Sequence, residues 1–157
     1  MVSIEIELFT YSTIEQFYNS RCAIIPNEIG VYIVVAPESF IVEFINQTTA
    51  INEYHEKNLL YPAEDLKMKF SETDHKILYI GKAGGEINRL RQRIKQYVRY
   101  GYHEVENHRG GRAIWQIKNN RKLLLGYFVC NNPETIEREL LSEYYNKNGT
   151  YPVANWI

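Results

Sequence analysis

Two short tyrosine–glycine peptides, each inside an apolar and β-branched segment, constrain the fold of this chain most. The first peptide is Gly30-Val31-Tyr32, within a segment that runs from Ile29 to Val35. The second is Tyr79-Ile80-Gly81, which begins inside the segment Ile77–Ile80. Valine, isoleucine and tyrosine are enriched in strands, and both segments have the length of a strand. The two peptides therefore predict two strands that each carry a tyrosine close to a glycine.

The rest of the pattern predicts a third strand and several helices. Asparagine before proline typically starts a helix, glycine typically ends one, and Ser12 with Glu15 forms a capping-box pattern. We expect a strand over Lys122–Cys130 and helices over Ser12–Asn19, Asn88–Tyr100, Ala113–Lys118 and Asn132–Asn146, with Gly101 and Gly149 as stops. The predicted class is α+β, with a small central three-stranded sheet, mixed or antiparallel, flanked by helices.

Length and composition indicate one soluble globular domain over residues 1–157. The chain has 157 residues, of which 45% are hydrophobic and 24% charged. It lacks an apolar stretch of the roughly 20 residues that a membrane span needs, and its N-terminus has no secretory pattern. Cys22 and Cys130 are far apart in the sequence and form no metal-type pair. We therefore expect a cytoplasmic protein with two unpaired thiols and no membrane partner.

Charge is unevenly distributed along a chain whose net charge is only −1. Residues 37–76 contain eight acidic and four basic side chains, and residues 77–112 contain three acidic and eight basic ones. Nucleic-acid binding requires a local positive surface and does not require a basic protein. The second segment is therefore a candidate nucleic-acid surface, and a solvated helix of mixed charge is the alternative.

The last predicted helix carries a carboxylate on its apolar face. Ile136, Leu140, Leu141 and Tyr144 recur at helical spacing, and Glu137 falls inside the same stripe. A carboxylate that faces a core must be paired, protonated or bound to a cation. Carboxylate oxygen suits hard cations such as Mg²⁺ or Mn²⁺, which keep several waters. An ion pair between Glu137 and an arginine is the alternative.

The two tyrosine–glycine peptides and the helices that follow them resemble the GIY-YIG nuclease family. Gly30-Val31-Tyr32 matches the first family motif, and Tyr79-Ile80-Gly81 matches the second. The segment 90–98 is similar to the family helix with the catalytic arginine, and 137–144 to the helix with the metal-binding glutamate. The resemblance covers roughly 29–155, apart from an insertion at about 37–76. It implies a DNA endonuclease that hydrolyses phosphodiester bonds with magnesium or manganese as cofactor.

The resemblance implies a role for both tyrosines. Tyr79 would deprotonate the attacking water, and Tyr32 would orient that water or share the proton, although the two roles are interchangeable at this stage. A free tyrosine has a pKa of about 10, so nearby cations such as Lys82, Arg93 and a metal would have to lower it. Gly81 would leave room for the backbone to approach the helix or a phosphate.

The resemblance also implies roles for the helix residues. Arg93 would neutralise the charge that develops on phosphorus, with Arg89 as the alternative because it lies closer to the usual distance from the second tyrosine. Helical geometry favours Arg93. Glu137 would bind the metal, with Glu139 as the alternative ligand. Asn155 resembles the asparagine that closes the family core, in a C-terminal segment that we expect to be extended, and its amide would tie that segment to the site.

Further residues are candidates for contact with the nucleic acid. They lie on the arginine helix and on a loop whose two glycines would let backbone N–H groups converge on an anion. His108 on this loop would help to protonate the leaving group, and a plain exposed turn is the alternative. The nucleic-acid-binding candidates are Arg89, Arg91, Tyr97, His108, Arg109 and Arg112.

The insertion at 37–76 departs from the family, in which a short connection joins the two motif strands. Apolar residues at helical spacing predict a helix over Glu38–Thr48, and we expect the insertion to pack over or beside the site. Sequence preference would come from this insertion, from the loop around His108 or from a homodimer. The rival interpretations are a non-catalytic nucleic-acid or protein interaction module on the same fold and a nuclease directed at RNA.

Overall fold

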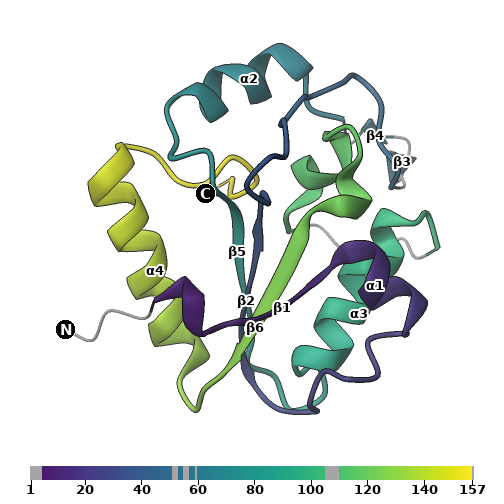
Figure 1. Cartoon of the computed structure of the whole chain (residues 1–157), viewed down its shortest axis with the longest axis vertical. Helices are drawn as coiled ribbons and strands as arrows, with labels where there is room; N and C mark the ends of the chain where they lie inside the picture. Colours follow the sequence, from purple (N-terminus) through teal and green to yellow (C-terminus); the bar gives the residue numbers. More distant parts are fainter. Residues whose placement is uncertain (1–4, 51–52, 55–56, 59, 105–109, 157) are drawn as a thin grey trace.

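The computed structural model describes residues 5–50, 53–54, 57–58, 60–104 and 110–156 (Figure 1). In these residues an antiparallel sheet of four strands is surrounded by four α-helices, which confirms the α+β class. None of the described helices has the length and apolar character needed to cross a membrane. The helices are α1 (Ile14–Asn19), α2 (Ala63–Ser71), α3 (Leu90–Gly101) and α4 (Pro133–Asn148), with 3₁₀ helices η1 (Ile6–Leu8), η2 (Arg112–Gln116) and η3 (Asn120–Lys122). The strands are β1 (Thr10–Thr13), β2 (Gly30–Val35), β5 (Ile77–Ala83) and β6 (Leu124–Val129), with β3 (Glu53–Tyr54) and β4 (Lys57–Asn58) as a separate hairpin.

The sheet has the strand order β1-β6-β2-β5. The three predicted strands are present as β2, β5 and β6, but the prediction of a three-stranded sheet is wrong because β1 pairs with β6 as a fourth strand. Strand β1 is largely polar, so its own sequence lacks an apolar strand pattern, and its pairing comes from its neighbour. The Tyr11 ring lies over Gly126, where an added Cβ would come within 2.4 Å of a ring carbon.

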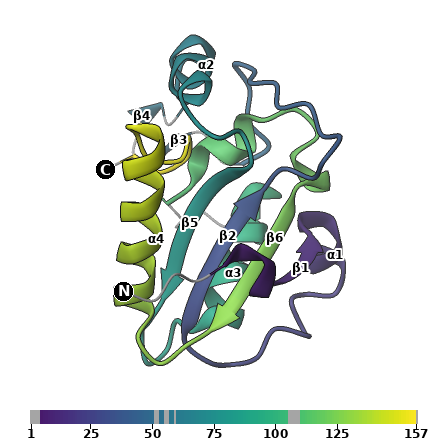
Figure 2. The same ribbon diagram turned by 60° about the vertical axis from the view of Figure 1, so that its left-hand side comes forward.

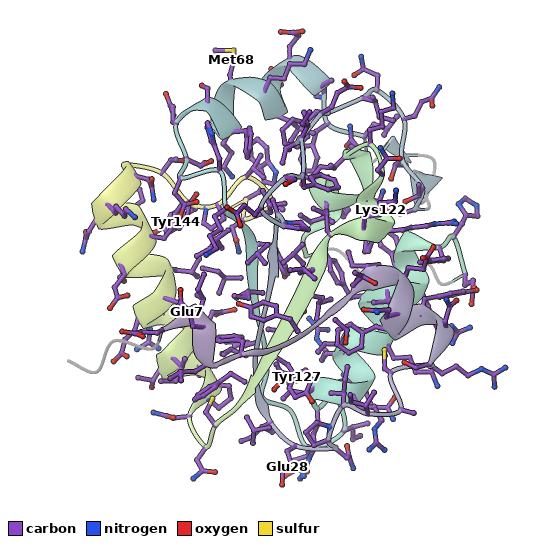
Figure 3. The ribbon with its side chains drawn as sticks, viewed as in Figure 1. Glu7, Glu28, Met68, Lys122, Tyr127 and Tyr144 are labelled. Carbon is purple, nitrogen blue, oxygen red and sulfur yellow. The ribbon has the colours of Figure 1, made fainter. Side chains whose placement is uncertain are left out.

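The two longest helices cover opposite faces of the sheet (Figure 2). Successive strand residues point to opposite faces, so Tyr32 packs toward α3 while Val31 packs toward α4. Tyr144 near the end of α4 points toward the turn before β5, and its hydroxyl donates to Asp74 Oδ1 at 3.2 Å (Figure 3). This contact and the apolar stripe fix α4, and therefore Glu137, relative to β5.

The insertion and the start of α3 lie at opposite ends of the β2–β5 pair. Gly30 lies opposite Ala83 at one end, and Val35 lies opposite Ile77 at the other. The insertion connects Val35 to Ile77, so α2 and the β3–β4 hairpin lie at that second end, at the top of Figure 1. Helices α3 and α4 both begin at the first end. The pairing therefore separates the insertion from the turn that follows β5.

The predicted helix over Glu38–Thr48 is wrong, because the segment runs along η2 in an irregular conformation. Phe44 forms an isolated β-bridge with Ile117, and the Ile45 N–H donates to the Gln116 carbonyl at 2.9 Å. These contacts use backbone groups that a helix would need for itself. The helix of the insertion is α2, further along the chain.

The ends of the remaining helices differ from the prediction by a few residues. The capping box of α1 uses Thr13 and Gln16 in place of Ser12 and Glu15, with hydrogen bonds of 3.1 and 2.8 Å between the two. Ser12 belongs to β1 and so precedes the helix. Helix α3 includes Gly101, and the predicted helix at 113–118 is the shorter 3₁₀ helix η2.

Candidate active site

An open groove of about 770 Å³ lies at the end of the sheet where β5 leads into α3. Strand β5 is an edge strand, with α3 on one face and α4 on the other, so the groove crosses the strand edge and reaches both faces. It is lined by four of the predicted site residues, which come from three elements: Tyr79, Lys82, Arg93 and Glu137. We call it the β5 groove.

The β5 groove lies away from the described part of the insertion. Among the residues that the structure describes, none from 37–76 lines it. The insertion packs instead beside Arg112 and Asn155, two other predicted site residues, through Tyr61 and Lys69. The reason for this separation is the register of the β2–β5 pair, which places the groove at the Ala83 end and the insertion at the Ile77 end.

Glu137 and Lys82 face each other across the groove. Lys82 Nζ lies 3.9 Å from Glu137 Oε1, which is longer than a hydrogen bond, and the Glu137 side chain is 22% exposed. Burial raises the pKa of Glu137, and Lys82 opposes that shift without cancelling it. Glu139 on the same helix does not line the groove. The geometry therefore favours Glu137 over Glu139 as a candidate metal ligand.

The two motif tyrosines lie together under the groove. Their ring centres are 6.0 Å apart, with Tyr32 fully buried and Tyr79 7% exposed. Burial raises the pKa of Tyr32, and it raises the pKa of Tyr79 well above its ordinary value, while Arg93 opposes both shifts. Arg93 by itself therefore does not give the expected lowering of the tyrosine pKa, because desolvation outweighs the guanidinium. Both phenols are neutral at pH 7.

Gly81 makes room for the Tyr32 ring. The two residues are directly opposite each other in the β2–β5 pair. A Cβ added to Gly81 would lie 2.7 Å from Tyr32 Cζ and 3.0 Å from a Tyr79 ring carbon. The glycine therefore positions both tyrosines, which differs from the predicted approach of the backbone to a helix or phosphate. Among the described residues, no group makes a hydrogen bond of good geometry with the buried Tyr32 hydroxyl.

The arginines at the start of α3 point in three directions. Arg93 lines the β5 groove and is half-buried, and no described carboxylate forms an ion pair with it. Arg89 is turned toward the Asn27 carbonyl at 3.4 Å, outside the groove lining. Arg91 donates to the Ile25 carbonyl at 2.6 Å on the far side of the helix. The structure therefore favours Arg93 over Arg89 as the arginine of the site.

Two of the predicted nucleic-acid contacts lie elsewhere. Tyr97 is fully buried, and its hydroxyl donates to the Gly111 carbonyl at 2.9 Å, so its ring cannot touch a nucleic acid. Arg112 donates to Tyr61 Oη at 3.0 Å and does not line the β5 groove. His108 and Arg109 lie outside the residues that the structure describes.

Asn155 ties the C-terminal segment to β5, as its amide was expected to do. Its Oδ1 accepts from the Ile80 N–H at 3.0 Å, and its Nδ2 donates to the Ile80 carbonyl at 2.9 Å. The segment is not extended throughout, because the Asn155 N–H closes a turn on the Pro152 carbonyl at 2.9 Å. Asn155 is buried and outside the groove lining, so it positions β5 and does not face a substrate.

Several polar residues that the sequence analysis did not select also line the groove. They include Asn88, just before α3, and Asn132 and Glu134 at the start of α4. The order and direction of the strands could have identified the two residues at the start of α4. Because β6 runs antiparallel to β2 and its Val129 lies opposite Gly30, the residues after β6 must emerge at the groove end of the sheet.

The groove offers a half-buried carboxylate, Glu137, and an exposed one, Glu134, to a divalent cation. Within the described residues, no group of three or more histidine, cysteine, aspartate or glutamate side chains is placed to hold a metal. Mg²⁺ is often bound through one or two carboxylates, with waters and substrate phosphates as its other ligands. A half-buried Glu137 at the wall of an open groove fits this mode of binding.

Comparison with models of protein families, with curated proteins and with solved structures found no match to this chain.

Proposed function

We propose that this chain is a divalent-metal-dependent endonuclease of the GIY-YIG type that hydrolyses phosphodiester bonds in DNA. One observation carries the proposal: Tyr79, Arg93 and Glu137, separated in sequence and on three different elements, line a single open groove. Lys82 adds a second cation beside them. Lys82 Nζ and Glu137 Oε1, 3.9 Å apart, form a loose ion pair, which contributes little to stability at an exposed site.

Arg93 is the residue best placed to bind the scissile phosphate. A planar guanidinium can hold a phosphate through two parallel hydrogen bonds, and no described carboxylate competes for it. Because Arg93 is half-buried, its charge is less screened than that of an exposed arginine. It would therefore stabilise the negative charge that builds up as the phosphodiester bond breaks.

Glu137 would hold the cation, which when bound supplies Lewis-acid stabilisation of the departing oxygen. Tyr79 would hold the attacking water by a hydrogen bond. After losing its own proton to solvent, its phenolate, stabilised by the positive charge of Arg93 and Lys82, would take a proton from that water. The burial of Tyr79 makes this step demanding, since its pKa lies above the ordinary value. Tyr32 is fully buried and would act as a positioning residue beneath Tyr79.

The rival proposal is a module that binds nucleic acid without cutting it. The observation in its favour is the raised pKa of both tyrosines, which disfavours either of them as a general base. Under this proposal the groove cations would bind phosphate, and no bond would break.

Nicking of supercoiled plasmid with Mg²⁺ or Mn²⁺ tests the proposal, with EDTA as the control. We expect Glu137→Gln to slow nicking by about 100-fold or more, because the variant loses the ligand charge. Glu139→Gln is the matched control, since it makes the same change on the same helix outside the groove. If Glu137→Gln nicks plasmid as fast as the native chain does, Glu137 is not the metal ligand. Binding without cutting on plasmid, single-stranded DNA, branched DNA and RNA would favour the rival module.

A further inference from the structure

Helix α3 has cations on several sides and no acidic residue. Its twelve residues include Arg91, Arg93, Lys95 and Arg99, and neither aspartate nor glutamate. Arg93 lies in the β5 groove, whereas Lys95 and Arg99 line a second groove between α3 and α1. Helix α3 therefore forms a basic wall shared by two separate grooves.

This second groove, the α1–α3 groove, has a volume of about 530 Å³. Helices α1 and α3 lie side by side over the same face of the sheet (Figure 1). Phe17, Cys22 and Val98 are buried and give the groove an apolar base, while Arg21 and Lys95 are more accessible. The volume lies within the usual range for a small-molecule site, so the groove can receive a ligand of nucleotide size.

The α1–α3 groove keeps a positive charge after its internal pairs are counted. Glu104 is the acidic residue that lines it, and Arg99 Nε lies 3.2 Å from its carboxylate while the Tyr18 hydroxyl also contacts it. Arg21 and Lys95 form no ion pair with any carboxylate in the described part of the chain. Two cations are therefore available to an anionic ligand.

The turn that carries Arg21 has a strained backbone. Arg21 and Cys22 have φ angles of 56° and 57°, in the left-handed region that residues other than glycine rarely adopt. Hydrogen bonds from Arg21 N–H to the Tyr18 carbonyl (3.1 Å) and from Cys22 N–H to the Phe17 carbonyl (2.9 Å) hold the turn. The turn is thus held in a defined conformation that places Arg21 at the groove.

An aromatic stack ends at the same groove. The Tyr18 and Tyr102 rings stack in parallel, with centres 3.6 Å apart and planes 3° apart. The Arg121 guanidinium lies 4.2 Å from the centre of the Tyr102 ring. Tyr102 covers one face of Tyr18, and Tyr18 itself lines the groove. Tyrosine faces in a basic groove are the surfaces on which proteins stack unpaired bases.

We infer that the α1–α3 groove binds an unpaired nucleotide of the nucleic-acid substrate, with a phosphate on Arg21 and Lys95 and a base against Tyr18. The inference rests on the proposed function for its ligand class and extends it to substrates with a single-stranded segment near the cleavage site. Duplex DNA offers phosphates but keeps its base faces stacked internally. A helix is about 10 Å wide, so a strand that crosses α3 would reach both grooves.

The charge part of the inference is tested by fluorescence anisotropy with a labelled single-stranded oligothymidine, in EDTA so that no cutting occurs. We expect Arg21→Gln/Lys95→Gln to weaken binding by about tenfold. The plot of the logarithm of the binding constant against the logarithm of the salt concentration should also become shallower, by about 0.7 for each phosphate that the variant no longer neutralises. Lys76→Gln/Lys147→Gln is the matched control, because both lysines are exposed and line neither groove. Equal affinity of the two double variants would overturn the inference.

The base part is tested with Tyr18→Ala and Tyr18→Phe on the same oligothymidine and on a duplex of equal length. Removal of a stacking surface for one base costs about tenfold or more, so Tyr18→Ala should weaken single-strand binding and leave duplex binding within twofold. Tyr18→Phe keeps the ring and removes only the hydroxyl that touches Glu104, so it should bind as the native chain does. If Tyr18→Phe binds as weakly as a folded Tyr18→Ala, as judged by thermal melting, base stacking is excluded.

The two proposals can fail separately. If the native chain cuts no substrate and the Arg21/Lys95 variant loses single-strand binding, the groove inference is supported and the nuclease is rejected. If polyglutamate binds as tightly as oligothymidine and shows the same loss in that variant, the groove takes acidic protein and the inference is wrong. Plasmid nicking with unchanged single-strand binding in the variant would support the nuclease and reject the groove inference.

Discussion

Two clusters of aromatic and cationic side chains lie beside the edge strand β5, and they differ in how their cations are engaged. The C-terminal cluster consists of Tyr61, Lys69, Arg112 and Trp156. The Tyr61 and Trp156 rings stack with centres 4.8 Å apart. Lys69 Nζ lies 4.1 Å from the Trp156 ring centre and donates to the Asn155 carbonyl at 2.5 Å. Each cation of this cluster has an aromatic face and an oxygen partner within the protein.

The β5 groove has similar side chains, but its cations are held more loosely. No described carboxylate pairs with Arg93, and Lys82 Nζ stays 3.9 Å from Glu137. Hydrogen bonds to charged groups are the stronger ones, so a fold that needed these cations for stability would have paired them. The comparison supports the proposal that the C-terminal cluster serves the fold, whereas the β5 groove keeps its charges for a ligand.

The largest effect that separates the two clusters is expected from one substitution made in each. Arg93→Gln should slow plasmid nicking by about 100- to 1,000-fold, because charge stabilisation at the phosphate is lost. Arg112→Gln removes a hydrogen bond and a cation–π contact to Tyr61, so it should lower the free energy of unfolding by about 1–2 kcal/mol. Single-turnover nicking and urea unfolding measure the two quantities. Strong nicking by folded Arg93→Gln, with activity lost in Arg112→Gln, would reverse the assignment.

A smaller effect is expected at Gly81, which links the groove to the core. In Gly81→Ala the new Cβ would meet the Tyr32 ring at 2.7 Å. Overpacking of this kind typically costs about 1–3 kcal/mol, and displacement of the tyrosines should also slow nicking. Gly85→Ala is the control for stability, since its Cβ would have no neighbour closer than 3.7 Å. Urea unfolding in which both variants are equally stable would show that Gly81 does not position the tyrosines.

Much of the groove was predictable because its signals are local. Strands β2, β5 and β6 are apolar and β-branched, and helix α4 has an apolar stripe that contains Glu137. The stripe alone distinguishes Glu137 from Glu139, because only one of them lies on the face toward the sheet. Helical spacing likewise favoured Arg93 over Arg89, and the groove lining agrees.

The rest of the fold and site depended on tertiary partners that a local pattern does not contain. Strand β1 is polar and forms because β6 offers a free edge. The sequence does not reveal whether an aromatic ring lies inside the protein or at its surface. The sequence therefore predicts Tyr97 as a nucleic-acid contact, although its ring is buried. Arg112 is engaged by Tyr61, which lies 51 residues earlier in the chain.

A further expected effect is a change in how stability depends on pH, and it tests whether the C-terminal cluster encloses its cation. Burial lowers the pKa of Lys69 to about 8, whereas an unfolded lysine has a pKa of about 10.4. Between these values the unfolded chain binds a proton that the folded chain does not, so stability should rise with pH across this window. Urea unfolding from pH 7.5 to 10 should show this rise in the native chain relative to Lys69→Met. Lys67→Met on the same helix, where the lysine is exposed, should follow the native curve. If the native and Lys69→Met curves run parallel, Lys69 is solvated and the proposed contrast between a closed cluster and an open groove does not hold.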